Sequence, residues 1–140
     1  MNSESYLVDT SAWILALRRN ALEAVKARIE ELLERDAILC TEIIKLELLG
    51  GTKTEKEYER LKTHLQSLKP ISTTNTQWEK AYELAFFLRR KGVTAPYTDI
   101  LIAACALTTN ATVLHIDNHF DIIAKYVSLK TESYVKDLHV

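Results

Sequence analysis

The chain has 140 residues, of which 47% are hydrophobic, so it is long enough to fold around one hydrophobic core. Its 18 Lys and Arg residues against 19 Asp and Glu residues give a formal net charge of −1. This near-neutral balance excludes the strongly basic surface of a typical duplex-binding protein, although it permits a local basic rim.

The ends and the apolar runs of the chain indicate a cytoplasmic protein without membrane segments. The N-terminus lacks the pattern of a signal peptide, and the longest unbroken apolar run, residues 100–107, is too short to span a bilayer. Cys40 and Cys105 each stand among apolar residues, which is typical of reduced, buried thiols.

The expected elements alternate between short strands and helices. In chain order, strands are predicted at residues 6–8, 37–40, 69–72, 112–116 and 126–129. Pairs with the spacing of a capping box, or of its Asn analogue, mark helix starts at Asn20 with Glu23, Thr54 with Glu57, and Thr76 with Glu79. Strands that read as continuous apolar runs between helices predict one α/β domain over residues 1–140. We expect a three-layer α/β/α sandwich with a short, mainly parallel sheet of four to five strands.

Two of the predicted strands are followed directly by a carboxylate. Asp9 follows residues 6–8 in Y-L-V-D-T-S, and Asp117 follows residues 112–116 in V-L-H-I-D. The ligand-binding crevice of an open parallel sheet lies beyond the carboxyl ends of its strands, so both side chains are predicted to reach the same rim. Each also has a simpler interpretation, because Asp9 could cap a helix that begins near Ser11 and Asp117 could form a turn.

Two acids in predicted helices are expected to converge on that rim. Glu47 lies on the apolar side of the helical run 41–51, where neither a cap nor a turn explains it. Asp99 follows Pro96, and either Thr98 or Asp99 is expected to cap the helix that begins there. Several carboxylates at one rim would repel each other unless cations neutralise them, and their oxygen ligands suit Mg²⁺ or Mn²⁺.

Four segments of the chain together resemble PIN domains, and in particular the VapC-type toxins of toxin–antitoxin pairs. They are V-D-T-S, E-L-L-G-G, P-Y-T-D-I-L-I-A-A-C-A-L and V-L-H-I-D-N-H-F-D-I-I-A, in the family's order over nearly the whole chain. The resemblance implies an acidic quartet with one supporting hydroxyl. The implied quartet is Asp9, Glu47, Asp99 and Asp117, and the hydroxyl is that of Thr10 or Ser11.

The sequence departs from the family pattern at one position. Many relatives carry a second acid two residues after the position of Asp117, where this chain has His119. We therefore assign the fourth acid to Asp117 and expect Asp121 to cap the last helix. A zinc site at His115 and His119 is not expected, because no cysteine or third histidine lies nearby, and ordinary polar contacts are predicted for both.

The resemblance implies an endoribonuclease that cuts RNA with water activated by one or two Mg²⁺ or Mn²⁺ ions. It also implies a homodimer and a small cognate antitoxin whose tail blocks the acids. Six apolar side chains are candidates for the antitoxin's contact surface: Ile14, Leu15, Leu17, Leu46, Leu48 and Leu49.

Other prominent side chains have two interpretations each. Arg89, Arg90 and Lys91 either compensate the dipole at the C-terminus of their helix or contact RNA phosphates. Trp13 and Trp78 either belong to the core or stack on bases, and their apolar surroundings predict the core.

Two other functions fit parts of the pattern. An α/β phosphotransfer or phosphatase-like domain also binds Mg²⁺ through clustered acids, but it usually has a lysine at a strand end, where this chain has H-I-D-N-H. A non-catalytic PIN-fold binding module usually lacks one or more of the acids, whereas this chain retains all four. The sequence therefore favours the metal-dependent ribonuclease.

Overall fold

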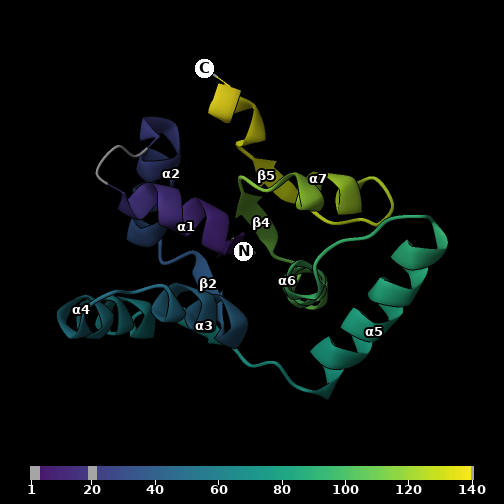
Figure 1. Ribbon diagram of the computed structural model, residues 1–140, viewed down its shortest axis with the longest axis horizontal. Coiled ribbons are helices and arrows are strands. Elements are labelled where there is room, and N and C mark those ends of the chain that lie inside the picture. Colours follow the sequence, from purple (N-terminus) through teal and green to yellow (C-terminus); the bar gives the residue numbers. More distant parts are fainter. Residues whose placement is uncertain (1–3, 19–21, 140) are drawn as a thin grey trace.

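The computed structural model describes residues 4–18 and 22–139, which fold around one sheet of five parallel strands (Figure 1). The strands are β1 (Tyr6–Val8), β2 (Ile38–Thr41), β3 (Lys69–Ile71), β4 (Thr112–His115) and β5 (Thr131–Ser133). The helices are α1 (Thr10–Leu17), α2 (Glu23–Glu34), α3 (Glu42–Gly50), α4 (Glu55–Gln66), α5 (Asn75–Arg90), α6 (Tyr97–Thr109) and α7 (Asn118–Ala124), followed by the 3₁₀ helix η1 (Val135–His139). The predicted α/β class is confirmed.

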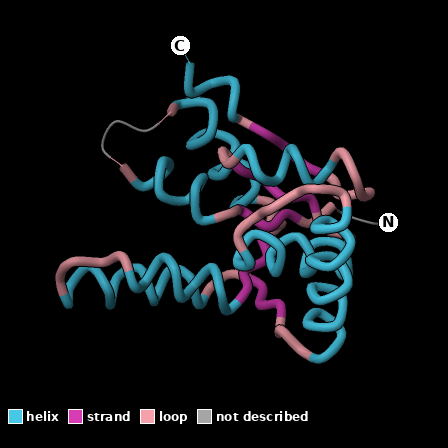
Figure 2. The backbone as a smooth tube through the Cα atoms, turned by 45° about the vertical axis from the view of Figure 1, so that its right-hand side comes forward, coloured by secondary structure: helices cyan, strands magenta, loops and turns pink. Residues whose placement is uncertain are grey.

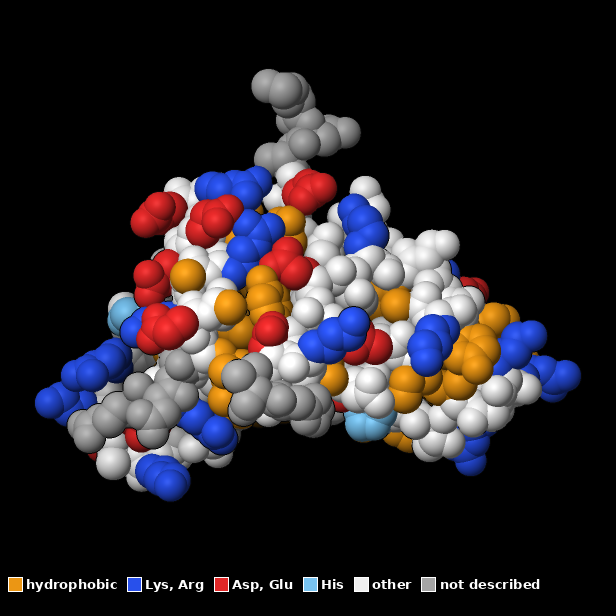
Figure 3. Space-filling model, turned by 90° about the horizontal axis from the view of Figure 1, so that it is seen from above, with side chains coloured by type: hydrophobic (Ala, Val, Ile, Leu, Met, Phe, Trp, Pro, Cys, Tyr) orange, Lys and Arg blue, Asp and Glu red, His pale blue; other side chains and the backbone are white. Residues whose placement is uncertain are grey.

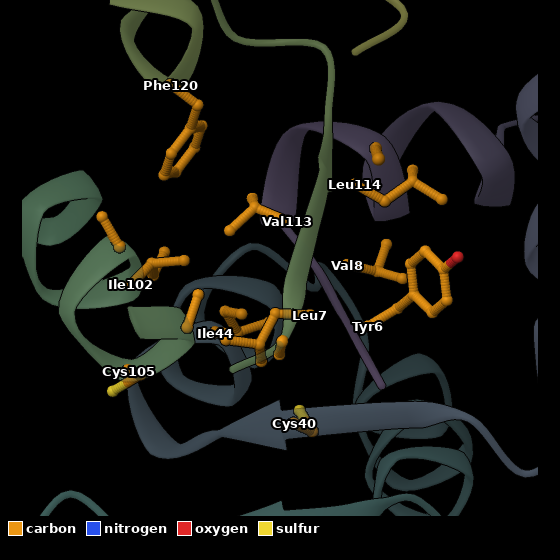
Figure 4. Packing of buried hydrophobic residues seen from close by; sticks show 14 of the residues in the cluster. Tyr6, Leu7, Val8, Cys40, Ile44, Ile102, Cys105, Val113, Leu114 and Phe120 are labelled. Atoms are coloured by element: carbon orange, nitrogen blue, oxygen red, sulfur yellow. The ribbon is translucent and has the colours of Figure 1, made fainter. Parts of the chain in front are cut away.

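Helices cover both faces of the sheet, and the strands lie inside the molecule (Figure 2). Figure 4 shows Val113 pointing to the side on which Phe120 of α7 lies and Leu7 lower down beside Ile44, whereas Val8 and Leu114 point to the opposite side. All of these side chains are fully buried. Successive residues of a strand face opposite sides, so a strand covered on both sides must be apolar throughout, as β1 is.

The strand order creates a switch point between β1 and β4. The sheet runs β3-β2-β1-β4-β5, so the chain first builds outward from β1 to β3 and then returns to place β4 on the other side of β1. Tyr6 pairs with Thr112 and Val8 with Leu114 in parallel register. Open α/β sheets bind their ligands at the carboxyl ends of such neighbouring strands. The residues that follow β1 and β4 therefore define the expected site.

Two of the three predicted helix starts can be compared with the structure. Thr54 caps α4, because its Oγ1 accepts a hydrogen bond from Glu57 N at 3.1 Å, as predicted. The prediction at Thr76 is wrong: α5 is capped two residues earlier by Thr74, whose N and Oγ1 both donate to Gln77 Oε1. Gln77 Nε2 also donates to Thr108 of α6, so a contact between helices fixes this start. The predicted cap at Asn20 lies outside the described residues.

The predicted strand at residues 126–129 is wrong. The N–H groups of Tyr126 and Val127 both donate to the carbonyl of Ile123, at 3.0 and 3.2 Å, so they close the end of α7. Pairing with β4 begins only where Val113 N donates to the carbonyl of Lys130, and β5 follows. The strand predicted at residues 37–40 begins and ends one residue later, as β2.

Both cysteines are buried and free, in agreement with the sequence prediction. Within residues 4–18 and 22–139, no helix is both long and apolar enough to cross a membrane.

Candidate active site

Asp9 lies at the tip of β1 and is held there by Ser11. The carboxylate caps α1 and accepts hydrogen bonds at Oδ2 from Ser11 N at 3.2 Å and Ser11 Oγ at 2.7 Å. The same Ser11 Oγ accepts a hydrogen bond from Ile116 N at 3.1 Å, immediately after β4. One hydroxyl thus connects the ends of the two strands at the switch point. Asp9 is only 3% exposed, and this burial raises its pKa above the usual range.

Asp117 lies beyond the end of β4 and caps α7. Its Oδ1 accepts a hydrogen bond from His119 N at 2.9 Å, and its own N–H donates to His115 Nδ1 at 3.1 Å. His115 is fully buried, and burial lowers its pKa, so a neutral ring accepts at Nδ1. The prediction that Asp121 caps this helix is wrong, because Asp117 occupies the cap position. Asp121 lies inside α7, where its Oδ2 accepts a hydrogen bond from Ser133 Oγ at 3.0 Å.

Asp99 is the third residue of α6 and points into the site from a buried position. The prediction that Thr98 or Asp99 caps this helix is wrong, since the cap position is Pro96, whose fixed φ suits the helix start. Asp99 is 7% exposed, and its Oδ2 has no hydrogen-bond partner among the described residues. Burial raises its pKa, and the nearby charges of Asp117, Asp9 and Glu47 raise it further. The four acids are therefore electrostatic neighbours.

Glu47 reaches the same site from the exposed side of α3. The premise that it lies on the apolar side of its helix is wrong, because α3 turns Ile44 and Leu48 inward and leaves Glu47 exposed. Its Oε1 accepts a hydrogen bond from Thr10 Oγ1 at 2.8 Å. Each of the two predicted hydroxyl side chains thus holds one acid: Thr10 holds Glu47, and Ser11 holds Asp9.

The sequence reasoning missed His119 as a member of the site. Its Nδ1 lies 2.8 Å from Asp117 Oδ1 and 3.2 Å from Asp99 Oδ2. Neither approach has the geometry of a hydrogen bond, and within the described part of the chain both His119 Nδ1 and Asp99 Oδ2 are buried without a partner. The prediction of ordinary, satisfied polar contacts is therefore wrong for His119, and it holds for His115 only at Nδ1, because His115 Nε2 is also buried without a hydrogen-bond partner. The available signal for His119 was its position two residues after Asp117, where the resemblance to PIN domains implied an acid.

The donor atoms of this site suit a divalent cation. One ligand atom each from Asp99, Asp117 and His119 lie within 4.8 Å of one another. A buried carboxylate oxygen without a partner costs free energy unless a proton or a cation neutralises it. Carboxylate oxygens with one imidazole nitrogen are common ligands of divalent ions in proteins. The acidic cluster is thus able to hold a metal.

Cations and aromatic side chains surround the start of α6. Arg89 lies in a pocket of about 440 Å³ that Phe86 and Tyr97 also line, and Tyr97 precedes Asp99 by two residues. Arg90 lies over the ring of Phe86, 5.4 Å from its centroid. At the right-hand end of the view in Figure 3, over α5, Lys and Arg side chains stand beside hydrophobic ones.

The two tryptophans differ in their environment. Trp13 is buried as predicted, with 7% of its surface exposed. The core prediction is wrong for Trp78, which is 43% exposed because α5 packs on α6 through Ala81, Leu84 and Leu88.

The fold and the site together define an α/β domain with an acidic centre, able to hold a cation, at the switch point of its sheet. The model of the PIN domain family matches residues 6–126. The chain is 33% identical to Ribonuclease VapC51 of Mycobacterium tuberculosis over 122 residues, which cover 85% of each protein. It is 31% identical to VapC ribonuclease Mb1587 of Mycobacterium bovis over 133 residues, or 91% of this chain and 98% of the relative.

A solved structure has the same fold. The complex of VapBC2 from Rickettsia felis with a DNA fragment from its promoter contains a chain that superposes with a TM-score of 0.78 at 23% identity, over 92% of this chain and 98% of that one. The chain belongs to the PIN domain family.

Proposed function

We propose that this protein is an endoribonuclease that depends on Mg²⁺ or Mn²⁺ and acts as the toxin of a VapBC-type toxin–antitoxin pair. The observation that carries the proposal is the buried, unpartnered Asp99 oxygen beside Asp9, Glu47 and Asp117. The two mycobacterial relatives described above are named ribonucleases, which supports RNA cleavage as the reaction of this protein.

Each residue of the site has a distinct role in this proposal. Asp9, Glu47, Asp99 and Asp117 are the catalytic acids that hold one or two ions. When bound, such ions provide a nucleophile from water at neutral pH and neutralise charge on the phosphate. Ser11 and Thr10 orient Asp9 and Glu47 through the hydrogen bonds described above. Fixed ligand geometry is what metal-dependent cleavage requires of a protein.

The RNA backbone is held by cations at the end of α5. Arg89, Arg90 and Lys91 are exposed, and no carboxylate of the described residues forms a salt bridge with any of them. Exposed cations without acidic partners are available for phosphate contacts. Arg89 lines a pocket together with Tyr97, which is two residues from Asp99, so a bound strand would extend from these cations toward the acids.

A small VapB-like antitoxin silences the enzyme by covering this site. Ile14, Leu17 and Leu46 are 42%, 59% and 67% exposed on the two helices that carry Thr10 and Glu47. They suit an amphipathic partner segment, which would then place an Arg or Lys among the acids. Leu48, a candidate for the same surface from the sequence, is buried and cannot contact the antitoxin there. We further propose that residues 1–140 act as one domain, in a homodimer and in the cytoplasm, where RNA is translated.

The alternative functions have less support. A phosphotransfer or phosphatase-like domain is not favoured, because the chain belongs to the PIN domain family. A non-catalytic binding module is not favoured, because all four acids are present and are electrostatic neighbours.

The proposal is tested by incubating purified protein with total RNA and with Mg²⁺, Mn²⁺ or EDTA, followed by mapping of the new ends. We expect discrete cuts with either ion, none with EDTA, and none with Asp9→Asn. Asp36→Asn is the matched control, because Asp36 is exposed and precedes the start of β2, at the end of the strands opposite to the acids. Cleavage that survives EDTA, or that Asp9→Asn retains in full, contradicts the proposal. Co-purification with the neighbouring small antitoxin should suppress the cuts.

A further inference from the structure

The geometry points to a metal-ligand role for His119: we propose that its Nδ1 binds the ion together with Asp99 and Asp117, and that it makes the site prefer Mn²⁺ over Mg²⁺. This inference rests on the proposed function, because it specifies the metal of the same site.

The spacing of the three side chains is the first argument. Two neighbouring ligands of an octahedral ion, each about 2.1 Å from it, lie about 3 Å apart. His119 Nδ1 is 2.8 Å from Asp117 Oδ1 and 3.2 Å from Asp99 Oδ2, without hydrogen-bond geometry in either case. The three atoms thus have the spacing that adjacent ligands of a single ion would have.

The local structure of α7 is the second argument. Asp117 Oδ1 accepts a hydrogen bond from His119 N at 2.9 Å, so the helix cap fixes the backbone of His119 relative to the carboxylate. Asp99 provides independent evidence that an ion belongs here. It is 93% buried, and its Oδ2, which lies 3.2 Å from His119 Nδ1, has no hydrogen-bond partner among the described residues. His115, in contrast, accepts a hydrogen bond at Nδ1, and its buried Nε2 lies 3.4 Å from Asp121 Oδ1, an acid outside the three-residue cluster.

The chemistry of the donors determines the metal preference. Mg²⁺ prefers oxygen ligands, whereas imidazole nitrogen favours transition ions. Replacing a carboxylate by a neutral imidazole also removes one negative charge from the site, which weakens the binding of Mg²⁺. His119 should therefore raise the affinity of the site for Mn²⁺ relative to its affinity for Mg²⁺.

Calorimetry without RNA tests the preference. We expect wild-type protein to bind Mn²⁺ at least about tenfold more tightly than Mg²⁺, and His119→Asp to lower that ratio by about tenfold. His64→Asp is the matched control, since His64 lies in α4, far from α7 in Figure 1, and it should leave the ratio unchanged. An equal ratio in wild type and His119→Asp overturns the proposal.

Spectroscopy of the bound ion tests the ligand itself. Electron spin echo measurements on Mn²⁺ bound to wild-type protein should show coupling to an imidazole nitrogen, and the coupling should change when the protein is labelled with ¹⁵N-histidine. It should disappear in His119→Asp and remain in His64→Asp.

The outcomes separate this inference from the proposed function. Mn²⁺ binding without nitrogen coupling overturns the inference, because His119 is then only an ion-pair partner of the acids, while RNA cleavage can still proceed. Nitrogen coupling without RNA cleavage supports the inference and contradicts the proposed function. Absence of metal binding overturns both.

Discussion

Replacing Asp99 by asparagine should stabilise the metal-free protein while it removes a metal ligand. Asp99 is almost fully buried beside three other acids, and its pKa is raised to about 8 from an ordinary value of 3.8. At pH 7 the folded protein must therefore bind a proton that the unfolded chain lacks. The difference between 7 and 3.8 is roughly three pKa units, each about 1.4 kcal/mol, which sets a ceiling of about 4 kcal/mol. Asparagine fills the same volume without this cost.

We expect about half of this ceiling to be observed. Relaxation of the neighbouring side chains reduces the cost in the wild type, so the free energy of unfolding should rise by about 2 kcal/mol. For a domain of this length, the melting temperature should rise by roughly 5–10 °C. Calorimetric unfolding in EDTA at low ionic strength measures this shift.

The dependence on pH provides the sharpest check. A carboxyl group with a raised pKa in the folded state contributes stability below its unfolded pKa, and that contribution is lost as the pH rises toward its folded pKa of about 8. The advantage of Asp99→Asn should therefore be small near pH 4.5 and grow up to about pH 8. Asp36→Asn removes an exposed charge and should change stability by less than about 0.5 kcal/mol at any pH.

Adding metal should make the wild type more stable than Asp99→Asn, the reverse of their order without metal. An ion that binds only the folded state at 100 times its dissociation constant stabilises it by about 2.7 kcal/mol. Mn²⁺ should raise the melting temperature of the wild type and leave that of Asp99→Asn nearly unchanged. If Asp99→Asn is destabilised without metal, or if its advantage does not depend on pH, the account of the buried acid cluster is refuted.

The remaining predictions concern the surroundings of the cluster. Glu47→Gln should lower cleavage of a labelled RNA by roughly 100-fold with a change in unfolding free energy below about 0.5 kcal/mol, because Glu47 is exposed; loss of the fold would contradict this. Ser11→Ala should destabilise the protein by about 1–3 kcal/mol in urea unfolding, because the N–H of Ile116 loses its partner; unchanged stability would argue against the strand connection. Changing residues 89–91 to glutamine in the Asp9→Asn background should weaken RNA binding and reduce its salt slope by about 2, measured by fluorescence anisotropy; an unaltered slope would exclude phosphate contacts there.

Local signals in the sequence were sufficient to predict strand β1, the start of α4 and the placement of two acids at the strand ends. The apolar run of β1 predicted a buried strand because a strand covered on both faces leaves no position for a polar side chain. The hydroxyl of Thr54 predicted the start of α4 because a cap satisfies N–H groups within three residues along the chain. Asp9 and Asp117 could be placed on one rim because parallel strands end at the same edge.

Elements whose position depends on distant partners were predicted less well. The β-prone residues 126–129 do not form a strand, because the N–H groups of Tyr126 and Val127 donate to the carbonyl of Ile123 and close the end of α7. β5, with the polar sequence T-E-S, is a strand only because β4 offers it an edge. Trp78 lies on the apolar stripe of α5, yet the packing of α5 on α6 leaves 43% of it exposed.

The sequence alone determined which acids stand at the strand ends, since their chemistry and their spacing along the chain are local properties. Only the tertiary structure decided how these acids meet. It brought α3 against α1, so that Thr10 holds an exposed Glu47, and it placed α7 beside α6, so that His119 lies between Asp99 and Asp117. These contacts join residues from separate helices, and the packing of the helices on the sheet sets their distances, which no periodicity along the chain encodes.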